Sequence, residues 1–175
     1  MARYRRNFLA GGSYFFTVTL ENRHSDLLTS QIDLLRSAFN HVRQQHPFDI
    51  DAIVVLPDHL HAILTLPVGD KDFPMRWRLI KSWFARQLPA SQVLNPRHAK
   101  KSERGIWQRR YWEHTLRDEL DVNNHVNYIH INPVKHGYVK RAIDWPYSSI
   151  HRYVKNGVLP VDWAGDDVVG GAFGE

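Results

Sequence analysis

Cysteine is absent from this 175-residue chain. Its absence excludes thiolate zinc sites, thiol nucleophiles and disulfide bonds, so a bound metal must use histidine, carboxylate or amide ligands. No apolar run approaches the roughly 20 residues that cross a bilayer. The basic N-terminus is interrupted by Gly11, Gly12 and Ser13, which is unlike a signal peptide. We therefore expect a cytoplasmic protein that has no membrane partner.

The composition excludes disordered and collagen-like chains, because 43% of the residues are hydrophobic and 12% are aromatic. A chain of this length buries about two thirds of its unfolded surface, so its core needs no disulfide or zinc. We find no internal repeat. The sequence predicts one folded domain.

Charge is distributed unevenly along the chain. The last 14 residues contain four acidic and no basic residues, so residues 1–161 carry 23 basic against 14 acidic side chains, or +9. We expect a basic domain at 1–161 and an acidic tail at 162–175. A basic domain is typical of nucleic-acid binding, although a merely soluble basic protein has the same composition. The tail could occupy a DNA cleft and restrain activity, or it could be a solvated end.

The hydrophobic periodicity predicts an α+β fold of the ferredoxin-like (RRM-like) type, βαββαβ. The expected strands are 14–20, 48–56, 59–66 and a segment near 112–116, and the expected helices are 28–45, 73–88 and 118–131. Asn132 and Pro133 are expected to interrupt the third helix, and Pro133 to open a further turn that ends near Gly137. A short helix follows Trp145. The turn at Pro133 and this short helix are extra C-terminal helices that follow the βαββαβ unit.

Residues 59–66 are expected to form a central strand of this antiparallel sheet, because their apolar residues lie on both faces. The first two helices can cover only one face. The third helix is therefore expected to cover the other, which gives helices on both faces.

His59 and His61 are two residues apart on the predicted central strand, so their imidazoles project from the same face and could share one metal ion. Eleven histidines in 175 residues make such a spacing common by chance. The alternative is a pair of half-buried strand histidines whose rings are hydrogen-bonded.

Tyr128 and Asn132 are four residues apart, so they share a helix face if the helix continues through Asn132. A phenol and an amide could then face the histidine pair. In the alternative, Tyr128 fills the core and Asn132 only caps the turn that begins at Pro133.

The joint pattern resembles the REP-associated tyrosine transposases, which are relatives of the insertion-sequence single-strand transposases in the HUH endonuclease superfamily. PDHLHAI, then NYIHINPVKHGYV and DWPYSS, carry the resemblance in this order. RYRR, WQRRYWEH and VDWAGD are also similar to that family. The resemblance extends over nearly the whole chain except the loop at 89–105.

The resemblance implies cleavage of single-stranded DNA by a tyrosine and a divalent metal held by the HUH histidines. On this chain His59 and His61 would be metal ligands and Tyr128 the nucleophile. A third, polar ligand would fall on Asn132, where related transposases commonly have the longer glutamine. The family's substrates are extragenic palindromes that fold as hairpins, and its product is a 5′-phosphotyrosine with a free 3′-hydroxyl.

This ligand set suits Mg²⁺ or Mn²⁺ that binds together with an anionic phosphate, although zinc also binds such sites. A metal on a non-bridging oxygen withdraws negative charge from the phosphodiester. A phenol has a pKa of about 10, so a nearby metal or base must assist its attack.

The candidates for phosphate contacts are basic residues near the N-terminus, on the second helix and before the fourth strand: Arg5, Arg6, Arg78, Lys81, Arg109 and Arg110. Each could equally be a solvated charge. Trp107, Tyr111 and Trp112 could stack on unpaired bases or belong to the core.

The function expected is therefore that of a metal-dependent single-strand DNA endonuclease and strand transferase that acts on hairpin DNA. The alternative is a hairpin DNA- or RNA-binding protein with the same fold and no chemistry. A cupin-like zinc enzyme is disfavoured, because no Glu follows the His-x-His pair at a cupin spacing. We expect a monomer, and a dimer stays open.

Overall fold

The computed structural model describes residues 7–89, 105–165 and 173–174. Its centre is a four-stranded sheet in the order β2-β3-β1-β4, and every neighbouring pair is antiparallel. The strands are β1 (Ser13–Thr19), β2 (Asp49–Val55), β3 (His59–Thr65) and β4 (Trp112–Thr115). This is the predicted α+β arrangement, with β3 inside the sheet.

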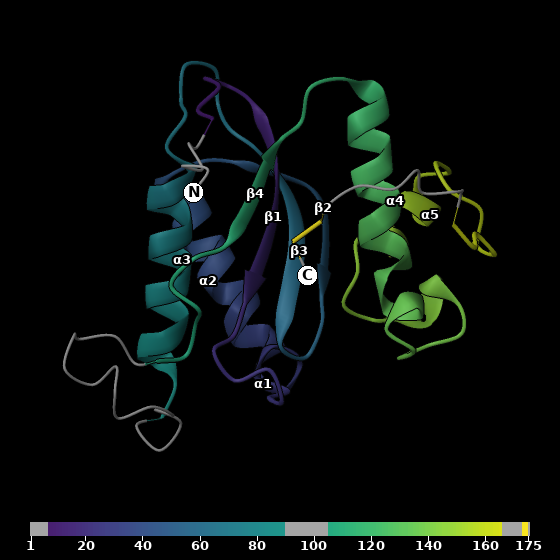
Figure 1. Cartoon of the computed structure of the whole chain (residues 1–175), viewed down its shortest axis with the longest axis horizontal. Coiled ribbons are helices and arrows are strands. Elements are labelled where there is room, and N and C mark those ends of the chain that lie inside the picture. Colours follow the sequence, from purple (N-terminus) through teal and green to yellow (C-terminus); the bar gives the residue numbers. More distant parts are fainter. Residues whose placement is uncertain (1–6, 90–104, 166–172, 175) are drawn as a thin grey trace, which may run out of the picture.

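The helices are α1 (Leu27–Ser30), α2 (Ile32–Gln45), α3 (Phe73–Gln87), α4 (Glu119–Lys135) and α5 (Ile150–Lys155), with a 3₁₀ turn, η3 (Ala142–Asp144). Figure 1 shows α2 and α3 on one face of the sheet and α4 on the other, with α5 beside α4. None of these described helices is long and apolar enough to cross a membrane.

An apolar core lies on each face of the sheet, and a smaller one lies beside α5. Leu60, Ala62 and Leu64 of β3 belong to the core under α2 and α3, whereas Ile63 belongs to the core under α4. Alternation along a strand therefore directs odd-numbered β3 residues, including His59 and His61, toward α4. The expected placement of the third helix over the histidine face is confirmed.

The sheet register sets the side chains under α4 in rows. Thr17 of β1 pairs with His61 of β3 on one side and with Trp112 of β4 on the other. One step along the same face, Phe15 pairs with His114 of β4. The α4 side of the sheet therefore presents three polar side chains in two neighbouring rows: Thr17, His61 and His114.

Helix α4 begins as predicted and ends later than predicted. The Asp118 side chain accepts a hydrogen bond of 2.8 Å from the Asp121 N–H and caps its first turn. The expected interruption at Asn132 and Pro133 is wrong, because α4 continues through both to Lys135. Pro133 lies in the last turn, where its missing N–H costs a single backbone bond. Gly137, with φ of 74°, then ends the helix.

Candidate functional site

His59 and His61 lie side by side on β3 in the layer between the sheet and α4. Their side chains are 2% and 0% exposed, and the ring centroids are 5.0 Å apart. Neutral imidazoles so deeply buried need partners for their nitrogen atoms. The partners of the Nδ1 atoms decide which nitrogen of each ring carries a lone pair.

The His59 tautomer is set by Asp58. Nδ1 of His59 lies 2.7 Å from Oδ1 of Asp58, and the other carboxylate oxygen accepts a 2.6 Å hydrogen bond from Nε of Arg23. Burial raises the pKa of Asp58, but its hydrogen bond to His59 and the Arg23 charge outweigh this, so the pKa lies below its usual value. An ionised carboxylate only accepts, so the His59 proton is on Nδ1. Nε2 is then a buried lone pair, and it has no hydrogen-bond partner among the described residues.

The His61 tautomer is set by Thr17. The Thr17 hydroxyl donates to the carbonyl oxygen of Phe173 at 2.6 Å, so it must accept from Nδ1 of His61, 2.8 Å away. Nε2 of His61 therefore also carries a lone pair. Burial lowers the pKa of His59, against its hydrogen bond to Asp58, and this favours a neutral ring there.

Tyr128 and Asn132 face this pair from α4. The Tyr128 ring centroid is 5.2 Å from that of His61, and Nδ2 of Asn132 is 3.3 Å from Nε2 of His61. Both residues are buried, and Nζ of Lys135 lies 4.5 Å from the Tyr128 ring centroid. Continuation of α4 through Asn132 is what brings the amide to the imidazole, so Asn132 is not the cap of a new turn.

These donors fit a divalent cation. Two imidazole nitrogens that carry lone pairs and one amide group lie together in a buried setting, and a hydrogen bond at the opposite nitrogen of each ring fixes its orientation. The buried His59 Nε2 is costly without a partner, and a bound cation would supply one.

Phe173 covers the tyrosine. Its ring stacks on Tyr128 with centroids 3.8 Å apart and an interplanar angle of 10°, and it also contacts Phe15 and His125. Gly174 follows with φ of 75°, and a Cβ atom there would come within 2.3 Å of Trp112. A residue with a side chain would not fit at position 174 in this path.

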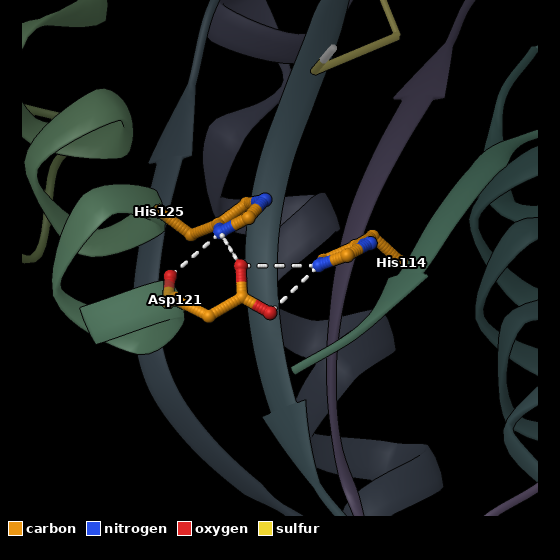
Figure 2. Close-up of side chains that lie close together, drawn as sticks. All are labelled: His114, Asp121 and His125. Carbon is orange, nitrogen blue, oxygen red and sulfur yellow. Dashed lines mark hydrogen bonds and ion pairs between the residues drawn. The ribbon is translucent and has the colours of Figure 1, made fainter. Parts of the chain in front are cut away.

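A second group of polar residues lies nearby, as Figure 2 shows. His114 of β4 and Asp121 and His125 of α4 place one ligand atom each within 4.8 Å of one another. These three side chains could hold a metal ion. Among the residues that the structure describes, it is the one such group of three histidine or carboxylate side chains.

The predicted DNA contacts are distributed differently. Arg78 of α3 and the Arg109–Arg110 pair before β4 are exposed, whereas Nζ of the half-buried Lys81 donates a 2.7 Å hydrogen bond to the Gln108 carbonyl oxygen. Arg5 and Arg6 lie outside the described residues. The DNA-contact roles of all six residues stay predictions.

The aromatic residues before and within β4 pack inward. Trp107 contacts Phe84, and Tyr111 contacts Phe16, in the core under α2 and α3. Trp112 packs against the core under α4. Their packing favours the core interpretation over base stacking.

Several residues of the site were not singled out from the sequence. Thr17 and Phe173 carry no local signal, because only the sheet register and the return of the chain bring them to His61. Asp58 belongs to the PDHLHAI segment, but the sequence alone gives it no role. The spacing of Asp121 and His125, four residues apart on a predicted helix, was a usable signal, and His114 on the preceding strand completes it.

Comparison with known proteins gives a consistent result. No family model matches the chain. It is 51% identical over 166 residues to a REP-associated tyrosine transposase of Escherichia coli (strain K12), covering 95% of this chain and 93% of that protein. A Haemophilus influenzae protein assigned provisionally to the same family is 47% identical over 167 residues, 95% of each chain.

A solved structure agrees with these relatives. The REP-associated tyrosine transposase bound to a REP hairpin superposes with a TM-score of 0.85 at 48% identity, covering 100% of this chain and 98% of that one. Sequence identity of this level over nearly full length shows the family as well as the fold. The chain therefore belongs to the REP-associated tyrosine transposases, which are HUH-type endonucleases.

Proposed function

We propose that this chain cuts and rejoins single-stranded DNA at hairpin-forming palindromes, with Tyr128 as the nucleophile. The observation that carries the proposal is the matched orientation of His59 and His61. Asp58 and Thr17 each accept one Nδ1–H, so both rings carry their lone pair on Nε2, in the layer that Tyr128 and Asn132 face. Nε2 of His61 meets the Asn132 amide 3.3 Å away, and the buried Nε2 of His59 has no hydrogen-bond partner among the described residues, which supports a cation at this place.

The phenol oxygen of Tyr128 attacks phosphorus, and the bond from phosphorus to the 3′-oxygen breaks. The DNA 5′-phosphate is then esterified to the tyrosine, the 3′-oxygen leaves as a hydroxyl, and the phenol proton is lost to a base. The number of phosphoester bonds does not change. A 3′-hydroxyl can therefore reverse the step and reseal or exchange strands without ATP.

His59 and His61, with Asn132 as a third donor, would hold Mg²⁺ or Mn²⁺. When bound, the cation would neutralise charge on the phosphate oxygens and orient the phosphate for in-line displacement. Asp58 and Thr17 hold the two rings in the required tautomers, and α4 fixes Tyr128 and Asn132 on one face.

The related structure, which holds a REP hairpin, supports hairpin DNA as the substrate class. The exposed Arg78, Arg109 and Arg110 would contact phosphates, as would Arg5 and Arg6. Lys81, whose ammonium also donates to the Gln108 carbonyl oxygen, would be a further contact. One chain supplies both histidines, the tyrosine and the amide, which supports action as a monomer.

The tail at 162–175 would restrain this activity. Phe173 stacks on the nucleophile, and its carbonyl oxygen binds the Thr17 hydroxyl that orients His61. DNA must displace Phe173 before a phosphate can reach Tyr128. Phe173 makes these contacts through its aromatic ring and its backbone carbonyl oxygen, not through a charge. The acidic residues Asp166, Asp167 and Glu175 lie outside the described residues.

The decisive experiment incubates the protein with end-labelled hairpin DNA that carries a single-stranded flank, in Mg²⁺ or Mn²⁺, followed by denaturing electrophoresis. We expect a denaturation-resistant adduct that is lost with EDTA, with Tyr128→Phe and with His59→Ala or His61→Ala. Tyr153→Phe and His24→Ala are matched controls that should keep it. An adduct in Tyr128→Phe would identify a different nucleophile, and tight hairpin binding with no adduct in any condition would favour the binding-protein alternative.

A further inference from the structure

Asp121 lies between two imidazoles that come from different elements. Its Oδ2 is 2.9 Å from Nε2 of His114 on β4, and its Oδ1 is 3.2 Å from Nδ1 of His125, one turn further along α4. The two rings stack with centroids 4.8 Å apart and an interplanar angle of 13°. Figure 2 shows the carboxylate between the two rings. The group therefore connects the edge strand to the first turns of the helix that carries Tyr128.

The carboxylate is held in place by further contacts. The backbone N–H of Arg117 donates to Oδ2 at 3.1 Å, and the Asp118 cap fixes the Asp121 backbone. The pKa of Asp121 lies below its usual value, because the hydrogen bonds from His114 and Arg117 outweigh the effect of burial, which raises it. The side chains of His125, Asp121 and His114 are 8%, 12% and 27% exposed, so the group is sheltered and still reachable.

Two imidazoles and one carboxylate are a ligand set that proteins use for transition metals, with further positions left for water. At bond lengths of about 2.1 Å, neighbouring ligand atoms of a metal lie about 3.0 to 3.5 Å apart. The contacts of 2.9 Å and 3.2 Å to the carboxylate are already near this range. The whole group spans 4.8 Å, so only a small approach of the two rings is required.

This group does not share ligands with the His59–His61 pair. The Phe15 ring contacts His61 at 5.6 Å and His125 at 4.7 Å between centroids, so an apolar side chain adjoins both groups. The register places His61 opposite Thr17 and His114 opposite Phe15, in successive rows of the sheet. A cation bound by His114, Asp121 and His125 would be a second ion.

We propose that His114, Asp121 and His125 form a second divalent-metal site, which takes an imidazole-preferring cation such as Zn²⁺, Co²⁺ or Ni²⁺ and fastens the start of α4 to β4. In the metal-free state both rings donate an N–H, His114 to the carboxylate and His125 to the Asp121 carbonyl oxygen at 2.7 Å. Coordination at these nitrogens moves each ring proton to its other nitrogen. The ion then replaces two hydrogen bonds with metal–ligand bonds.

The test titrates EDTA-treated, full-length protein with Co²⁺, without DNA, and follows both the visible absorption of bound Co²⁺ and the bound equivalents after dialysis. We expect one equivalent that survives in the His59→Ala/His61→Ala double variant and is lost in Asp121→Asn. His114→Gln, which keeps a donor for Asp121, should lose it too. His24→Ala is the histidine control.

A second readout needs no activity. Saturating Zn²⁺ should raise the Tm of the His59→Ala/His61→Ala variant by about 5 °C, because a cation that binds only the folded state stabilises it. Asp121→Asn and His114→Gln should show no such rise, and circular dichroism in EDTA reports whether each variant is folded. The proposal is overturned if every bound equivalent persists in both Asp121→Asn and His114→Gln, or if none remains in the His59→Ala/His61→Ala variant. Neither result depends on whether Tyr128 cleaves DNA.

Discussion

The ring of Phe173 stacks face to face on the ring of Tyr128, with 3.8 Å between their centroids. The same residue accepts a hydrogen bond from Thr17 through its carbonyl oxygen. A segment near the end of the chain therefore covers a side chain from the middle of α4. In the proposed reaction, this segment would restrict access to Tyr128.

Removal of residues 166–175 should increase adduct formation. One aromatic stack and one hydrogen bond contribute about 2 kcal/mol together, which corresponds to roughly a thirtyfold change in the open population. The measurement is the initial rate of the Tyr128–DNA adduct with hairpin DNA. Truncation after Gly165 keeps Trp163, which is 8% exposed in the core beside α5, in place.

Two variants separate the charge of the tail from its aromatic contact. Phe173→Ala should reproduce most of the increase, whereas Asp166→Asn/Asp167→Asn/Glu175→Gln should reproduce it only if acidity is the restraint. An unchanged rate in the truncated chain would refute the restraining role of the tail.

Asp58→Asn should weaken metal binding by His59. Oδ1 of Asp58 accepts a hydrogen bond from Nδ1 of His59, 2.7 Å away. A hydrogen bond to the ring nitrogen that does not bind the metal typically changes metal affinity by about 10- to 100-fold. The measurement is the Mn²⁺ concentration that gives half-maximal adduct. Asp144→Asn, at an exposed carboxylate paired with Arg141, is the control and should not shift it. Equal Mn²⁺ requirements in both variants would argue against a role for Asp58 in the site.

The buried His130 should make folding stability depend on pH. Burial, assisted by the charge of Arg152, lowers the pKa of His130 to about 4. The unfolded imidazole takes up a proton near pH 6.5, so the stabilisation is complete above that value and is lost as the pH falls toward 4. The loss is on the order of 3 kcal/mol in the free energy of unfolding.

The measurement is urea unfolding of the metal-free protein between pH 7 and pH 4. His130→Gln keeps an amide that can donate to or accept from the Ser149 hydroxyl, which lies 2.9 Å from Nε2 of His130, so it should fold and show a smaller pH dependence. An identical pH dependence in the variant would show that other groups account for the loss.

Replacement of Arg78, Arg109 or Arg110 by Ala should weaken hairpin binding. Each lost phosphate contact should reduce the slope of log K against log salt by about one unit, with little change in sequence preference. Fluorescence anisotropy with a labelled hairpin at several salt concentrations measures both quantities. Arg141→Ala, which removes an exposed arginine paired with Asp144, is the control. A variant that changes neither affinity nor slope identifies a solvated charge.

Much of the fold was predictable because its signals are local. The apolar strand at 59–66 and the apolar stripes of the first two helices were recognisable locally, and apolar residues on both faces of that strand predicted helices on both faces of the sheet. The end of α4 was not predictable from local rules. Pro133 normally stops a helix, but here tertiary packing of Tyr128 and Asn132 against β3 supports one continuous helix.

Local spacing along the sequence was enough to predict which residues can share a face. The spacing of two puts His59 beside His61, and the spacing of four puts Tyr128 near Asn132, because strand and helix repeats are fixed by the backbone. Tertiary contacts set which nitrogen of each ring carries the lone pair, place Phe173 on Tyr128, and bring His114 to Asp121 and His125. Those facts depend on partners far apart in sequence, such as Thr17 with Phe173, and no local rule brings such groups into contact.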